Sequence, residues 1–125
     1  GMAVTLNGIA QGYAADAVRA TLQAHGVEHA LIDTGEFGAI GRNERDEPWN
    51  VGVEDPHDPS RLLTALRLNG RALATSADHR SSFSADRRHH HIIDPATGDS
   101  PPALSSLTVV ADSAMRADAS SAWRE

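Results

Sequence analysis

The sequence predicts an α+β domain in which an antiparallel β-sheet is flanked by helices. Two segments have the spacing of amphipathic helices, one near each end of the chain, and short apolar runs alternate with turn residues between them. This order differs from the regular alternation of strand and helix in parallel folds. The 125 residues are enough to bury one core. We expect a single, partial domain over residues 1–125, cut at both ends, with Gly1 as a remnant of tag cleavage.

The first helix is predicted from residue 9 to residue 25, after the end of a strand at residues 3–6. Small and apolar side chains recur here every four positions, and Gly26 stands where a C-terminal cap belongs. Gly8 and Gly12 open the helix with a tight turn, at which another group can approach the bare backbone closely. Close packing of the helix on a sheet is the alternative explanation of these glycines.

Strands are predicted throughout the middle of the chain, bounded by turn residues. They cover residues 29–33, 39–41, 49–53, 62–68, 71–75, 82–85, 88–93 and 104–111. Asn69-Gly70 is the strongest hairpin signal and predicts that the strands on either side of it pair. A second hairpin is expected through Asp86-Arg87. Ser113 then caps a final helix.

Charge and composition exclude several classes of function. The formal net charge is −6, whereas phosphate backbones attract clustered cations, so we expect no nucleic-acid partner. The chain has no cysteine, which excludes disulfides and thiolate chemistry, and no lysine, which excludes a lysine base or Schiff base. No apolar run approaches the length of a membrane span, and no signal peptide is recognised.

A run of three histidines at positions 89–91 suggests two different roles. Consecutive side chains on a strand point to opposite faces, so only His89 and His91 could share a side. A zinc site would need a third ligand such as His79 or Asp94, and exposure of two of the three histidines to solvent is the simpler interpretation. His91 is also a candidate for a cleft, because it leads into a strand end that is bounded by proline.

Other polar residues have a structural and a functional interpretation side by side. Asp94 could face a cleft or form an Asx turn with the residues that follow it, and the turn is favoured. Asp118 stands early in the last helix, near the positive end of that helix dipole, where an acid is also a good helix-start residue. Thr75 and Ser76 end a strand, and their hydroxyls could bind phosphate or satisfy a turn.

Five short motifs follow one another along the chain, at residues 7–13 (NGIAQGY), 33–36 (DTGE), 74–77 (ATSA), 91–98 (HIIDPATG) and 114–118 (AMRAD). Taken together in this order, they resemble those of the ApbE family of FAD:protein FMN transferases. The first two are similar to the NosX branch of the family, which is associated with nitrous oxide reduction. The resemblance implies an ApbE-like, T-fold-like domain, of which this chain would hold the C-terminal portion only.

The resemblance also implies an activity, which is Mg²⁺-dependent cleavage of FAD and transfer of FMN to a protein. The FMN would be joined through a phosphoester to a threonine or serine of an acceptor flavoprotein in the periplasm. In such phosphoryl transfer a metal neutralises the diphosphate and a base helps the hydroxyl to attack.

Metal ligands carry over from the family by position. The backbone carbonyl of Gly8 and the carboxylate of Asp118 are expected to hold Mg²⁺, a hard cation that prefers oxygen. The family's threonine ligand, four residues after the aspartate, falls on Ala122. Ser121 supplies a hydroxyl one position earlier and could serve only if the final turn of the helix is shifted.

The remaining site residues concern the phosphate and the flavin. His91 matches the family histidine near the transferred phosphate. Thr75 and Ser76, together with Tyr13, are expected to line the flavin side. Many members of the family carry lysine where this chain has Gln11, which removes a cationic contact to the cofactor.

The sequence alone is compatible with two functions. The chain is either a flavin transferase domain that keeps the metal and histidine half of the site, or an inactive remnant that folds and binds flavin weakly or not at all. Family members have a long N-terminal region without a counterpart here. Strand edges are therefore expected to be exposed and to pair two copies into a homodimer. A zinc-binding module built on the histidine run is a third option.

Overall fold

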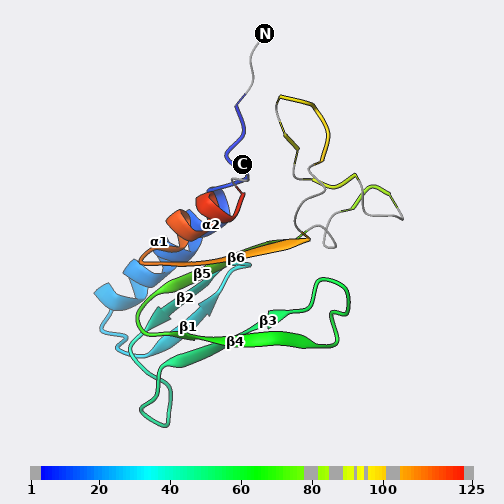
Figure 1. The fold of residues 1–125 in the computed structure, drawn as a ribbon. Helices are drawn as coiled ribbons and strands as arrows, with labels where there is room; N and C mark the ends of the chain where they lie inside the picture. Colours follow the sequence, from blue (N-terminus) through cyan, green and yellow to red (C-terminus); the bar gives the residue numbers. More distant parts are fainter. Residues whose placement is uncertain are drawn as a thin grey trace.

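Helices α1 (Ala10–Ala24) and α2 (Ala114–Ala122) run antiparallel on one face of a four-stranded sheet in this computed structural model (Figure 1). A two-stranded sheet packs on the opposite face, which gives three layers. The structure describes residues 4–77, 82–84, 89–91, 93–94, 96–100 and 105–122. The predicted α+β class with antiparallel strands is confirmed.

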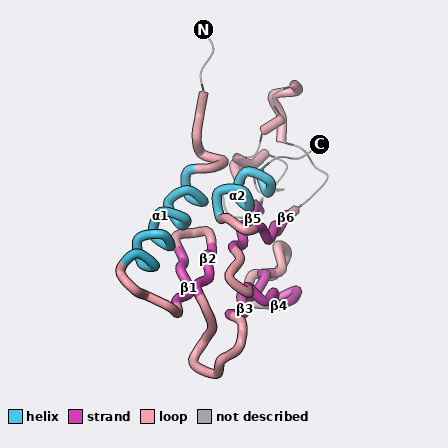
Figure 2. The backbone as a smooth tube through the Cα atoms, turned by 90° about the vertical axis from the view of Figure 1, so that its left-hand side faces the viewer, coloured by secondary structure: helices cyan, strands magenta, loops and turns pink. Residues whose placement is uncertain are grey.

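The four-stranded sheet has the strand order β1-β2-β5-β6. Its strands are β1 (Ala30–Asp33), β2 (Phe37–Ile40), β5 (Ala72–Ala77) and β6 (Ser106–Ala111). The second sheet pairs β3 (Trp49–Glu54) with β4 (Leu62–Leu68). Figure 2 shows β3 and β4 on the side of the molecule away from α1.

The main hydrophobic core lies between the two sheets. Strands β2 to β5 each contribute one buried residue to it, namely Ala39, Val51, Leu68 and Leu73. A smaller cluster on the helix side consists of Ala15, Ala72 and Ala114. Because these three side chains are single methyl groups, both helices approach the sheet and each other closely.

Helix α1 ends in a Schellman motif, at the glycine that predicted its cap. Gly26 has a φ of +80°, and its N–H donates to the carbonyl of Gln23 over 3.0 Å. The N–H of Val27 donates to the carbonyl of Leu22 over 3.0 Å, which completes the motif. The helix predicted from residue 9 to residue 25 is thus confirmed to within one residue at each end.

The hairpin predicted at Asn69-Gly70 is wrong, although both of its strands form. Strand β4 pairs with β3, whereas β5 pairs with β2 and β6, so the chain crosses here from one sheet to the other. Gly70 has a φ of +68°, but Asn69 does not have the positive φ that a type I′ hairpin turn needs at both central positions. The guanidinium of Arg19 holds this crossing, since it donates to the carbonyls of Gly70 (3.3 Å) and Asp112 (3.2 Å).

Other predicted elements have mixed outcomes. The strand end predicted at residues 3–6 is wrong for residues 4–6, which have no regular structure. Strands β1 and β2 form a hairpin, in agreement with the predicted strand, turn and return. Of the second predicted hairpin, Ser82 and His90 form an isolated antiparallel bridge, while Asp86-Arg87 lies outside the described residues.

Neither described helix has the length and apolar character that crossing a membrane requires.

Candidate active site

A cavity of about 730 Å³ opens beside the N-terminal end of α1. Its walls come from the turn before α1, the turn between β1 and β2, the end of β5, the segment around residue 91 and the last turns of α2. Five of the seven predicted site residues line it, namely Gly8, Thr75, Ser76, His91 and Asp118. The fold therefore gathers in one place residues from four distant segments of the sequence.

Asp118 reaches this cavity from the second turn of α2, and the other helix fixes its position. Its side chain is 6% exposed, and its Oδ2 accepts a hydrogen bond of 3.0 Å from the backbone N–H of Gly12. That N–H belongs to the first turn of α1 and has no partner inside its own helix. Asp118 thus complements the positive end of the dipole of α1, not that of α2 as the sequence suggested.

The converse contact holds the start of α2. The two carboxylate oxygens of Asp16 in α1 accept hydrogen bonds of 2.9 Å from the N–H groups of Ala114 and Met115. The Oγ of Ser113 accepts a third from the N–H of Arg116 over 3.2 Å, which confirms the predicted cap. Each helix therefore supplies a carboxylate to the first turn of the other, and this reciprocal capping sets their register.

The two glycines of the opening turn have different roles. A Cβ on Gly12 would lie 2.4 Å from the carbonyl oxygen of Ala114, so this glycine is required for close packing, against a helix instead of a sheet. Gly8 lines the cavity, and a Cβ there would lie 3.4 Å from the Cβ of Ala122. The position that the resemblance equates with a threonine metal ligand therefore stands beside the predicted carbonyl ligand.

Ser76 and Ser121 face each other where β5 contacts α2. Their Oγ atoms are 2.9 Å apart, and the Ser121 hydroxyl lies 3.0 Å from the carbonyl oxygen of Asp118. Ser76 lines the cavity, whereas Ser121 is 1% exposed and does not line it. A metal role for Ser121 would require a shift of the last turn of α2, because its side chain does not line the cavity.

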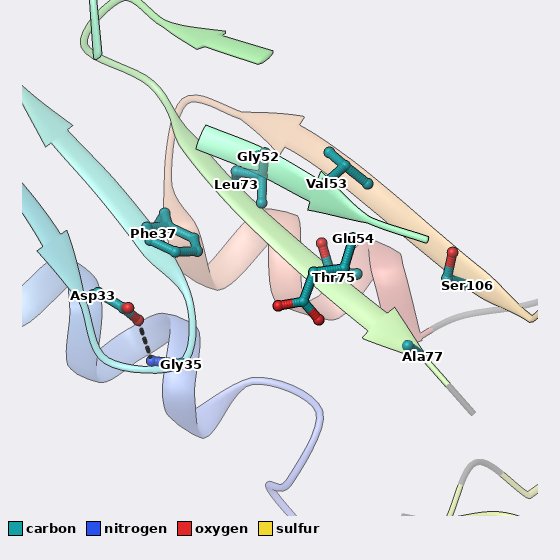
Figure 3. A pocket seen from close by; sticks show the side chains of 10 residues that line it. All are labelled: Asp33, Gly35, Phe37, Gly52, Val53, Glu54, Leu73, Thr75, Ala77 and Ser106. Atoms are coloured by element: carbon teal, nitrogen blue, oxygen red, sulfur yellow. Dashed lines mark hydrogen bonds between the residues drawn. The ribbon is translucent and has the colours of Figure 1, made fainter. Parts of the chain in front are cut away.

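Thr75 lies between this cavity and a second one of about 210 Å³ on the other face of the sheet (Figure 3). Its Oγ1 is 2.9 Å from the Oγ1 of Thr108 in β6. Because successive residues of a strand point to opposite faces, the hydroxyl of Thr75 is directed away from the helices while that of Ser76 is directed toward them. The two predicted flavin contacts therefore do not share a face of the sheet.

The three histidines differ in exposure. His90 is 3% exposed, whereas His89 and His91 are both exposed, as the alternation predicted. Of these three, only His91 lines the larger cavity. No group of three or more metal-binding side chains is found in the part of the chain that the structure describes, so the zinc option gains no support there. His79, its suggested third ligand, lies outside that part.

Two further candidates lie away from the cavity. The Oδ1 of Asp94 accepts a hydrogen bond from the N–H of Ala96 (2.8 Å), and its Oδ2 accepts one from the hydroxyl of Thr97 (3.3 Å). This confirms the favoured turn interpretation of Asp94. Tyr13 is 65% exposed on α1 and lines neither of the two cavities described above.

The walls of the larger cavity carry negative charge. Asp118 and Glu36 are each 6% exposed, and the described lining residues include no arginine or lysine. A diphosphate would be repelled here unless a cation entered with it. The donor set of one carboxylate, the carbonyl of Gly8 and nearby hydroxyls fits Mg²⁺, which keeps several waters and binds substrate phosphates. It does not fit zinc, which takes at least three protein ligands.

Glu36 and Gln11 also line this cavity and were not predicted as site residues. The side chain of Gln11 crosses to the turn between β1 and β2, where its Nε2 lies 3.1 Å from the position of a Cβ on Gly35. The sequence carried two signals for Glu36, namely a polar turn directly after a buried strand and its place in the motif at residues 33–36. Neither signal identified Glu36 itself as a residue that borders the cavity.

A model of the ApbE family matches residues 1–123 of the chain. The chain belongs to the ApbE family. It is 34% identical over 121 residues to the FAD:protein FMN transferase of Klebsiella pneumoniae (strain 342), and 34% identical over 120 residues to that of Escherichia coli (strain K12). These matches cover 92% and 93% of this ApbE-family chain but 34% of each relative. The chain therefore spans about a third of the length of the curated relatives it matches.

Solved ApbE structures share the fold. The ApbE protein of Thermotoga maritima superposes with a TM-score of 0.87 at 34% identity, over 95% of this chain and 39% of that one. The apo form of the flavinyl transferase ApbE of Pseudomonas stutzeri gives a TM-score of 0.78 at 36% identity, over 95% and 38%. The expected ApbE-like architecture is thus confirmed.

Proposed function

We propose that this ApbE-family domain transfers FMN from FAD to a threonine or serine of an acceptor protein, with Mg²⁺. The observation that carries the proposal is the meeting of Gly8, Asp118 and His91 in one cavity. The relatives named above are FAD:protein FMN transferases, which supports the same chemistry for this chain. We further propose that the chain corresponds to the C-terminal portion of these relatives.

The transfer replaces the phosphoanhydride bond of the FAD diphosphate with a phosphoester bond to the acceptor. The hydroxyl oxygen of the acceptor attacks the phosphorus on the FMN side of FAD, the bond from this phosphorus to the bridging oxygen breaks, and AMP leaves with that oxygen. We assign His91 as the base that takes the hydroxyl proton. Gly8 and Asp118 would hold Mg²⁺, which supplies neutralisation of the diphosphate charge when bound.

Charge supports the metal requirement independently of the family. Two buried carboxylates and no arginine or lysine among the described lining residues make the cavity a poor site for a bare diphosphate. Ser76 is the proposed polar contact to the flavin nucleotide from the helix side. Thr75 remains a proposed contact that lines the cavity, although its hydroxyl is directed to the other face of the sheet. Tyr13 and Ser121 remain proposed contacts that would have to be reached from outside this cavity or by a shift of α2.

The resemblance to one branch of the family suggests the cellular compartment and the process in which the protein acts. Residues 34–36 have the Thr-Gly-Glu form of the NosX branch, so we propose a periplasmic acceptor and a link to nitrous oxide reduction. We also propose a homodimer. Strand β6 forms one edge of the four-stranded sheet, and its six residues are half-buried and uncharged, so the edge lacks the charges that discourage pairing.

A second candidate function is an inactive flavin-binding remnant. The observation that favours it is that two of the predicted site residues, Tyr13 and Ser121, do not line the cavity. Such a remnant would keep the fold and the dimer but lack these contacts.

Incubation with FAD, Mg²⁺ and a peptide that carries a target threonine separates the two candidates. Covalent flavin on the peptide, detected by mass spectrometry and lost in Asp118→Asn, supports the transferase. Its absence at every protein concentration supports the remnant. Light scattering that finds a monomer at high concentration would contradict the dimer.

A further inference from the structure

The cavity contains a carboxylate that the proposed transfer chemistry does not use. Glu36 is 6% exposed and lines the same cavity as Asp118 and His91. A carboxylate withdrawn from water loses hydration and must be compensated by hydrogen-bond donors or cations. Because the Glu36 carboxylate borders the cavity, it can accept a hydrogen bond from a donor group of a bound molecule.

The backbone places Glu36 on the helix side of the sheet. Strand β2 begins at the next residue, and the side chains of Phe37 and Ala39 pack into the core between the two sheets. Gly38 lies on the other face, where a Cβ would be 3.8 Å from the Cδ of Arg19 in α1. Because alternate residues share a face, Glu36 lies on the same side as Gly38. It therefore approaches the cavity from the sheet, opposite the helix that carries the proposed metal ligand.

The turn before β2 fixes the base of this side chain. Gly35 has a φ of +98°, and its N–H donates to the Oδ1 of Asp33 over 3.0 Å (Figure 3). The N–H of Thr34 donates to the carbonyl of Glu36 over 3.2 Å. The neutral amide of Gln11 lies over Gly35 and also lines the cavity. The carboxylate is thus presented from an ordered turn, next to a polar but uncharged neighbour.

We propose that Glu36 accepts a hydrogen bond from a hydroxyl or N–H group of bound FAD, an inference that rests on the proposed function. The proposed Mg²⁺ site does not need Glu36, because Gly8 and Asp118 already supply its protein ligands. FAD carries donors in both halves, on the flavin ring and ribityl chain and on the adenosine. An ionised acceptor binds such donors more strongly than a neutral one.

Isothermal titration in the presence of Mg²⁺ tests this role without requiring transfer. We compare wild type, Glu36→Gln and the control Glu47→Gln, which changes an exposed loop carboxylate. Glu36→Gln is expected to weaken FAD binding about tenfold or more, and the control to change it by less than about twofold. FMN and ADP then locate the donor. Weakening with FMN alone assigns it to the flavin half, and weakening with ADP alone assigns it to the adenosine half.

A purely structural role for Glu36 predicts different results. Glu36→Asp keeps the negative charge but withdraws the carboxylate by one methylene. If Glu36 binds FAD directly, this variant binds FAD more weakly with little change in melting temperature. It replaces Glu36→Gln as the test if Glu36→Gln does not fold. Wild-type affinity for FAD in the folded variants overturns the inference and leaves the proposed function intact. Equal weakening with FMN and ADP together with a lower melting temperature also overturns it. Failure of the wild type to bind FAD at all overturns both proposals.

Discussion

The backbone N–H of Gly12 donates to the Oδ2 of Asp118 over 3.0 Å, which joins two helices whose residues are 106 positions apart. The bond satisfies a free N–H of the first turn of α1 and orients a buried carboxylate in the cavity wall. The packing of the helix pair and the geometry of the proposed metal site therefore depend on the same contact. Several consequences can be measured separately.

Gly12→Ala should destabilise the fold, although alanine is the better helix former. The new Cβ would meet backbone atoms of Ala114 and Met115 at 2.4 to 2.7 Å, and backbone cannot move aside cheaply. We expect a loss of about 1–3 kcal/mol in the free energy of unfolding, measured by urea denaturation. Gly52→Ala is the control, because its Cβ would meet only the end of the exposed Leu62 side chain. Equal midpoints for both variants would contradict the packing role.

Asp16→Ala should remove the cap that α1 supplies to α2. Two hydrogen bonds of 2.9 Å to the N–H groups of Ala114 and Met115 are lost, so we expect a cost of about 1–2 kcal/mol in unfolding free energy. Asp112→Ala is the matched control, because its carboxylate is 87% exposed and makes only a 3.8 Å ion pair with Arg71. The cap assignment fails if the two variants unfold at the same urea concentration.

Ala122→Thr should strengthen Mg²⁺ binding. Residue 122 lines the cavity beside Gly8, so a hydroxyl there would add an oxygen donor next to the proposed carbonyl ligand. We expect FAD binding to saturate at several-fold lower Mg²⁺ concentration. Ala119→Thr, on an exposed position of the same helix, controls for the lower helix propensity of threonine. An identical Mg²⁺ dependence in both variants would argue against a metal at this position.

His91→Ala should abolish transfer while leaving nucleotide binding nearly unchanged. The loss of a general base typically lowers the rate by about 10²–10⁴-fold. His89→Ala is the control, because His89 is also exposed but does not line the cavity. Transfer rates on the acceptor peptide are compared at saturating FAD. Equal activity of the two variants would remove His91 from the proposed chemistry.

Local patterns predicted those parts of the fold that depend on local interactions. The four-residue spacing and Gly26 predicted α1. The turn predicted at residues 34–38 indicated the β1–β2 hairpin, although Phe37 and Gly38 already belong to β2. The Asn69-Gly70 signal failed because it reports a turn and not the partners of the strands on either side. The strand partners depend on the core between the two sheets, to which Leu68 of β4 and Val51 of β3 both contribute.

The sequence predicted those residues of the candidate site that belong to recognisable motifs. Gly8, His91 and Asp118 were placed in one site by resemblance, and the cavity brings them together. The opposite directions of Thr75 and Ser76 follow from strand alternation and could have been deduced from their adjacency. The cross-helix cap by Asp16 could not, because its partners are defined only once the two helices have packed.

We propose that the cavity binds FAD through a metal held at Asp118, and titration of FAD with and without Mg²⁺ measures this dependence without requiring transfer. Asp118→Asn is the decisive variant, because the amide oxygen can still accept the N–H of Gly12 while the negative charge is lost. We predict FAD binding that requires Mg²⁺ in the wild type and is lost in Asp118→Asn, with thermal unfolding nearly unchanged. FAD binding of equal strength without Mg²⁺, or in the folded Asp118→Asn variant, would rule out a metal held at Asp118 as the basis of FAD binding.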